Sequence, residues 1–194
     1  MSPKFVHLHL HSEYSLVDGL VRIPELISHC TQNGTAASAL TDQSNVFGSS
    51  KFFRSAMSAG IKPIIGADLW VVDSENTGKP YKIVFLCQNN LGYKNLSILL
   101  TRAYREGQHR GIPMVHENWL TISQLTGIIC LSGGISGDIG LAFLTGSKET
   151  MLRSAAKWQA LIGERYYLEV FRTGRLQEEA YLQEVASVAE HLAI

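Results

Sequence analysis

The sequence has few cysteines, no net charge and no long apolar run, and each of these features excludes a class of protein. Its three cysteines (Cys30, Cys87 and Cys130) are odd in number and widely separated, which indicates reduced core thiols in a cytosolic protein rather than a disulfide framework. Lys plus Arg and Asp plus Glu each number 17, so the formal net charge is zero. This balance argues against a module that holds nucleic acid mainly by bulk charge. No uncharged apolar stretch is long enough to cross a bilayer, so we expect no membrane association.

What the sequence does contain is a concentration of histidine near its start. Three of the seven histidines lie within five residues, in the segment Val6-His7-Leu8-His9-Leu10-His11-Ser12. If this segment is a strand, the three imidazoles share one face and the two leucines the other, because successive side chains alternate. Neutral imidazole is the commonest side-chain metal ligand, and burying three imidazoles in any other way requires three hydrogen-bond partners. The spacing therefore predicts a metal site, or a former one, if carboxylates converge on it.

Further along the chain, helix-like and strand-like segments alternate. Apolar runs predict strands at 36–40, 63–72, 83–87, 127–132 and 166–170. We expect residues 108–118 to be irregular. Helical spacing predicts helices over 23–33, 90–107, 119–125 and 177–192, one with Phe52, Phe53 and Ala56 inward, and one on each side of Thr145-Gly146. Strands that are apolar on both faces and alternate with helices are typical of a parallel sheet covered by helices. Both a closed β/α barrel and an open sheet fit this order.

The polar residues favour the barrel. Asp42, Asp68, Gly134 and Thr173 all fall at the C-terminal ends of predicted strands, as do His9 and His11. In a β/α barrel those ends surround one mouth, where sites are built. The chain stops directly after a predicted helix, so we expect residues 1–194 to be one domain, cut before its closing strand, from a longer protein.

Three motifs resemble those of the PHP (polymerase and histidinol phosphatase) domain. They are His7–Ser12 with Asp18-Gly19 behind it, Ala39–Asp42 followed by Asn45–Gly48, and Gly60–Asp68. The segments Asn89–Leu96, Leu131–Gly134 and Tyr167–Glu169 resemble the version at the N-terminus of the α subunit of bacterial DNA polymerase III. The resemblance implies an α/β fold, a distorted, TIM-like (β/α)7 barrel, here truncated before the last strand.

The resemblance also implies a metal pocket, which this sequence matches only in part. Active PHP domains hold three metal ions at the barrel mouth. His9, His11, Asp18 and Asp68 match ligand positions, although Asp68 is one methylene shorter than the usual glutamate. Four former ligand positions are degenerate, namely Gln43, Lys82, Gly134 and Thr173, and we expect His7, Asp42 and Glu169 to line the pocket as well. A lysine that points inward would repel cations, and the losses remove lone pairs that three ions need.

The resemblance therefore predicts that the three-metal cluster is lost. We expect no bound cofactor in this region, or at most one weakly held zinc or manganese ion, and magnesium in the polymerase domain of the parent chain. The parent would carry out template-directed DNA synthesis on DNA and dNTPs in the bacterial cytoplasm. This region would be an inactive scaffold that braces the polymerase core and docks the proofreading exonuclease subunit, and its partners would include other subunits of the polymerase III holoenzyme. The alternatives are a surviving metal-dependent phosphoesterase or 3′–5′ exonuclease, and a stand-alone relative of histidinol phosphatase.

One basic run falls outside these motifs, at Arg102–Arg110. It is either a surface that touches a DNA backbone or a neighbouring domain, or simply the solvated end of a helix, where the dipole favours cations.

Overall fold

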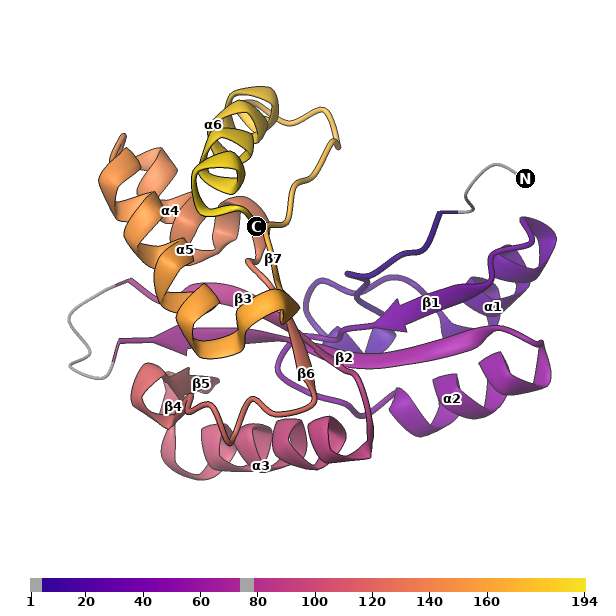
Figure 1. The fold of residues 1–194 in the computed structure, drawn as a ribbon. Coiled ribbons are helices and arrows are strands. Elements are labelled where there is room, and N and C mark those ends of the chain that lie inside the picture. The colour runs from indigo at the N-terminus through magenta and orange to yellow at the C-terminus, as the bar shows by residue number, and fades with distance from the viewer. Residues whose placement is uncertain (1–4, 74–78) are drawn as a thin grey trace.

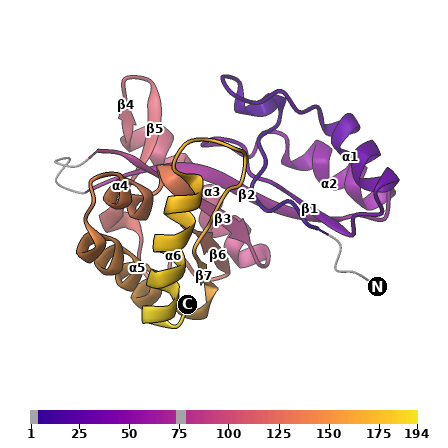
Figure 2. The ribbon, with the colours of Figure 1, turned by 90° about the horizontal axis from the view of Figure 1, so that it is seen from above.

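The computed structural model describes residues 5–73 and 79–194, which contain six α-helices and seven strands (Figure 1). The helices are α1 (Ile23–Gln32), α2 (Ser49–Ser58), α3 (Asn90–Glu106), α4 (Asp138–Leu144), α5 (Lys148–Ile162) and α6 (Glu178–Leu192). The strands are β1 (Ala37–Leu40), β2 (Lys62–Val72), β3 (Tyr81–Cys87), β4 (Gln108–His109), β5 (Ile112–His116), β6 (Ile128–Leu131) and β7 (Tyr166–Tyr167). The helices α4, α5 and α6 lie on one side of the sheet and α3 on the other, while α1 and α2 flank the end near β1 (Figures 1 and 2).

The sheet is mixed, and the prediction of a parallel sheet is wrong. Its order is β4-β5-β2-β3-β6-β7, with β1 also paired to β2. The pairs β1–β2, β2–β5 and β6–β7 are parallel, whereas β2–β3, β3–β6 and β4–β5 are antiparallel. The predicted turn at 73–80, most of which lies outside the described residues, is too short for the crossover that a parallel pair needs. Two successive strands with a short connection therefore form an antiparallel pair.

The long strand β2 organises the sheet, because two strands share one of its edges. Residues 62–65 pair with β1 and residues 70–72 pair with β5, while β3 occupies the opposite edge. Gly66 lies between the two halves, where a Cβ atom would overlap the carbonyl oxygen of Phe85. Among the described residues no pairing joins β1 to β7, so the sheet is open. The predicted barrel is therefore not confirmed.

Most helix predictions are confirmed, because each depends on local periodicity. On α3, the predicted inward residues Leu96, Leu99, Leu100 and Ala103 are all buried in the main core. On α2, Phe52 and Ala56 are buried as predicted, but Phe53 is 49% exposed. Residues i and i+4 share one helix face and residue i+1 is turned away from it, so only Phe52 and Ala56 face the core.

Four short segments differ from prediction. The histidine segment 7–11 is not a regular strand, since the backbone bends at Leu8 and His9. The supposedly irregular segment 108–118 contains the β4–β5 hairpin, and 119–125 forms turns after a short 3-10 helix (Glu117–Trp119) instead of a helix. The strand predicted at 166–170 is reduced to Tyr166 and Tyr167. None of the helices in the described part of the chain is long and apolar enough to span a membrane.

Candidate metal site

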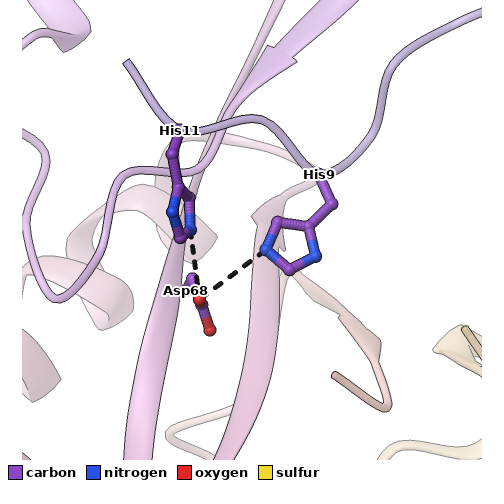
Figure 3. Close-up of side chains that lie close together, drawn as sticks. All are labelled: His9, His11 and Asp68. Atoms are coloured by element: carbon purple, nitrogen blue, oxygen red, sulfur yellow. Dashed lines mark hydrogen bonds and ion pairs between the residues drawn. The ribbon is translucent and has the colours of Figure 1, made fainter. Parts of the chain in front are cut away.

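His9 and His11 reach the site from the extended segment 7–11, which precedes α1 in the chain and runs beside β1. His7 accepts a hydrogen bond from the Ala39 N–H at 2.7 Å, and Leu10 accepts one from the Thr41 N–H at 2.9 Å. The Leu10 N–H bonds to the Thr41 hydroxyl at 2.8 Å instead of to a strand backbone, which explains why no regular ladder forms. Leu10 also packs against the core formed with α1 and α2. These contacts anchor the segment so that His9 and His11 point the same way (Figure 3).

The carboxylate of Asp68 is the centre on which three side chains converge. Asp68 lies on β2 and its side chain is fully buried. Its Oδ2 atom lies 3.1 Å from His11 Nε2 and 3.6 Å from His9 Nε2 (Figure 3). The same oxygen accepts a hydrogen bond from Lys82 Nζ at 2.8 Å. Lys82 comes from the neighbouring strand β3, and its ammonium also lies 5.2 Å from the ring centre of Trp70.

A second carboxylate stands behind each imidazole. His9 Nδ1 lies 3.0 Å from Glu169 Oε1, and His11 Nδ1 lies 3.0 Å from Asp18 Oδ1. An Nδ1–H that donates to a carboxylate leaves Nε2 with a lone pair and raises the basicity of the ring, as in many metal sites. Here each Nε2 faces Oδ2 of Asp68, so a cation bound at this point would contact both rings.

The electrostatics of the site favour positive charge. Burial alone would lower the pKa of His9, but its hydrogen bonds to Asp68 and Glu169 outweigh that effect and raise the pKa to about 9. Burial alone would raise the pKa of Asp68, but hydrogen bonds from His11 and His9 and the charge of Lys82 hold it well below its usual range. The imidazolium of His9 and the ammonium of Lys82 therefore balance the buried carboxylates without any other cation.

Six of the predicted positions come together here, and three do not. His9, His11, Asp18, Asp68, Lys82 and Glu169 form the cluster described above. His7 is exposed and packs edge-on against Phe5. Asp42 is buried and accepts hydrogen bonds from Ser12 and Ser15, so it fixes the loop after His11 and does not line the cavity. Gln43 donates its backbone N–H to Ser15 and does not line the cavity either.

Of the last two predicted positions, Thr173 lines the same cavity of about 360 Å³ as the histidines, whereas Gly134 is not among its lining residues. At Gly134 φ is +58°, and a Cβ atom would overlap the ring of Phe171, whose centre lies 5.6 Å from that of His9. Thr173 donates its backbone N–H and its hydroxyl to Glu178, at the start of α6. The sequence prediction missed Phe171, although Glu169, Phe171 and Thr173 alternate in the way that residues on one face of an extended segment do.

The donor set fits a single divalent ion better than a cluster. The ligand atoms of His9, His11 and Asp68 all lie within 4.8 Å of one another, and two imidazoles with one carboxylate suit zinc or manganese. The Oδ1 atom of Asp68 is buried without a hydrogen-bond partner in the described chain, so one acceptor is still available. Lys82 already occupies Oδ2, so an ion bound at that oxygen would have to displace the ammonium or sit beside it.

Comparison with known proteins agrees with these motifs. The family model described as "PHP domain" matches residues 7–173. The chain is 42% identical to the DNA polymerase III subunit alpha of Vibrio cholerae over 188 residues, and 41% identical to that of Pseudomonas fluorescens over 192. The corresponding subunit of Escherichia coli strain K12 is 39% identical over 188 residues. These alignments cover 97%, 99% and 97% of this chain, which spans about 16% of the length of each relative.

Two solved structures also align. One is described as a metal-dependent phosphoesterase from Bifidobacterium adolescentis, with 13% identity, a TM-score of 0.41, and coverage of 97% of this chain and 64% of the other. The second is an amidohydrolase from Chromobacterium violaceum, with 25% identity and a TM-score of 0.41, covering 50% of this chain and 32% of the other.

Proposed function

The chain belongs to the PHP domain family, and on that premise we propose that it is the PHP region of a bacterial DNA polymerase III α subunit. Support comes from identities of about 40% to three such subunits across nearly the whole of this chain. The parent protein would be a template-directed DNA polymerase of the bacterial cytoplasm, with its magnesium-dependent chemistry on a domain outside this sequence.

Within that parent, this region is a scaffold without catalytic activity of its own. The observation that carries this proposal is the 2.8 Å contact between Lys82 Nζ and Asp68 Oδ2. Phosphodiester hydrolysis by a metal centre needs ions that activate water and neutralise the leaving oxygen. An ammonium on the central carboxylate, with an imidazolium beside it, satisfies the negative charge that would otherwise attract those ions.

The scaffold has two tasks in this proposal. It braces the polymerase core, and it docks the proofreading exonuclease subunit of the holoenzyme, which would supply the nuclease activity that this pocket lacks. A pocket held by its own ion pairs supports the bracing task, because it joins the N-terminal segment, β2, β3 and the segment after β7 through contacts that are up to 160 residues apart in sequence.

Metal content and nuclease activity of the 194-residue chain test the proposal. We expect elemental analysis after dialysis to find far less than one equivalent of zinc or manganese per chain. We also expect no release of nucleotides from a 3′-labelled DNA strand in the presence of either ion. Stoichiometric metal together with cleavage that disappears in His9→Ala would overturn the scaffold proposal. The Lys51→Ala variant, which removes an exposed cation elsewhere, controls for the loss of a surface charge.

A metal-dependent phosphoesterase or 3′–5′ exonuclease is the second candidate. It is favoured by the convergence of His9, His11 and Asp68 and by the carboxylate behind each imidazole. An ion held by these three residues would supply Lewis acidity towards a phosphate ester, while Glu169 and Asp18 would orient the two rings. The same metal and cleavage measurements distinguish the two candidates.

A further inference from the structure

The hairpin formed by β4 and β5 projects from the body of the molecule directly after α3. In Figure 2 it stands clear of the helices that cover the sheet. Gln108 pairs with Pro113 and His109 with Ile112, so Arg110 and Gly111 form the two-residue turn at its end. A Cβ atom added at Gly111 would meet nothing within 4 Å. Residues 108–112 are all exposed, so the tip is accessible to a large partner.

Basic side chains lie on this hairpin and on the helix turn before it, although the whole chain is neutral. Arg105, in the last turn of α3, and His109 and Arg110, on the hairpin, are all exposed, and we call these three residues the basic tip. The nearest acidic residue in sequence, Glu106, already accepts a hydrogen bond from Arg102 Nε at 2.8 Å. In residues 5–73 and 79–194, no carboxylate forms an ion pair with Arg105 or Arg110. Within that part of the chain, no carboxylate neutralises their guanidinium groups.

The backbone at Arg110 is strained for an arginine. Its φ is +52° and that of Gly111 is +81°, the signs that a type I′ hairpin turn requires at both central positions. Asn, Asp or Gly normally occupies the first of these positions, because other side chains meet a steric penalty in the left-handed region. The arginine therefore stands at a turn position that its backbone preference does not favour.

Neighbouring side chains extend the surface with planar groups. The guanidinium of Arg102 stacks 4.0 Å from the ring centre of Trp119. Stacking and the Glu106 bond hold Arg102 in one orientation, which reduces the entropy that it would lose on binding.

We propose that the basic tip contacts the phosphate backbone of double-stranded DNA. Guanidinium groups match phosphate oxygens through paired hydrogen bonds, and a two-stranded β-ribbon fits the major groove of B-DNA. The contact goes beyond the scaffold proposal and does not depend on the metal pocket, so either one can fail without the other.

Fluorescence anisotropy of the 194-residue chain with a labelled 20-base-pair duplex tests the contact. Two to three phosphate contacts predict weak binding whose logarithm falls with the logarithm of salt concentration with a slope of about −2 to −3. The double variant R105A/R110A should bind at least tenfold more weakly at low salt and lose about two units of that slope. The matched variant R54A/R153A removes two exposed arginines on α2 and α5 and should bind as the unchanged chain does.

The variant Arg110→Gly separates a binding role from a structural one. Glycine removes the strain at φ +52°, so the melting temperature should rise while DNA binding weakens. Equal binding by R105A/R110A and R54A/R153A, or no binding at the lowest salt, would overturn the proposal. Tighter hairpin-dependent binding to vesicles of phosphatidylcholine with phosphatidylserine would overturn it as well, because the site would then be a membrane contact.

Discussion

Replacing Lys82 with methionine is the change that most directly tests how the pocket is held together. Methionine keeps most of the aliphatic stem and removes only the ammonium that contacts Asp68 at 2.8 Å. At an effective dielectric constant of about 20, the attraction across that distance is roughly 6 kcal/mol before desolvation is subtracted. Breaking a fully buried pair costs about 3–5 kcal/mol. The Lys82 side chain is 17% exposed and His9 remains charged nearby, so we expect a net loss of about 2 kcal/mol.

Thermal unfolding at pH 7 measures this loss. For a chain of this size, about 2 kcal/mol corresponds to a decrease of about 4–8 °C in melting temperature. The matched control is Lys51→Met, which breaks the exposed pair with Glu13. Such surface pairs contribute between about 0 and 1 kcal/mol, so this variant should melt within about 4 °C of the unchanged chain.

Removing the ammonium should also free the pocket for a metal. If zinc binds Lys82→Met with a Kd of about 10 μM, then 100 μM zinc stabilises it by about 1.4 kcal/mol and raises its melting temperature by about 3–6 °C. The unchanged chain and the double variant H9A/K82M should show no rise. A K82M variant that is as stable as the unchanged chain and indifferent to zinc would refute the view that Lys82 replaces a metal.

Three further predictions concern neighbouring groups. Contacts with Asp68 and Glu169 raise the pKa of His9 to about 9, so its charge contributes roughly 3 kcal/mol to the free energy of unfolding below pH 6.5. This stability is lost as the pH rises through 9. Denaturant unfolding of the unchanged chain should show that loss, and unfolding of His9→Gln should not. Gly134→Ala should destabilise the chain by about 2–3 kcal/mol, because it combines a positive φ with overlap on Phe171. The control Gly60→Ala, with a φ of +72° and open space around it, should cost about 1 kcal/mol. Equal costs in thermal unfolding would contradict the overlap. Burial raises the pKa of the Cys87 thiol to about 12. Iodoacetamide at pH 8 should therefore modify Cys87 at least tenfold more slowly in the folded chain than in urea, as followed by mass spectrometry. Equal rates would be inconsistent with that burial.

How much of the site could be predicted varies from residue to residue. The alternation of His9 and His11 correctly suggests that they point the same way, because side-chain direction along an extended segment depends only on neighbouring residues. Glu169 and Lys82 were predicted near the pocket only through the family motifs. Strand β3 is apolar on both faces, so its pattern does not say to which face Lys82 points. Asp42 stands at a motif position yet turns to Ser12 and Ser15, which no periodicity could have indicated.

The sequence by itself determined most of the helices, the family and the pair of histidines, since each of these depends on residues that lie close together in the chain. Tertiary structure alone decided that β2 and β3 run antiparallel, that Lys82 contacts the carboxylate between the two imidazoles, and that Arg110 stands at the free end of a hairpin. His11 and Asp68 are 57 residues apart, and His9 and Glu169 are 160 apart. Contacts over such separations depend on strand register and chain direction, which are settled only when the whole sheet and its core pack together.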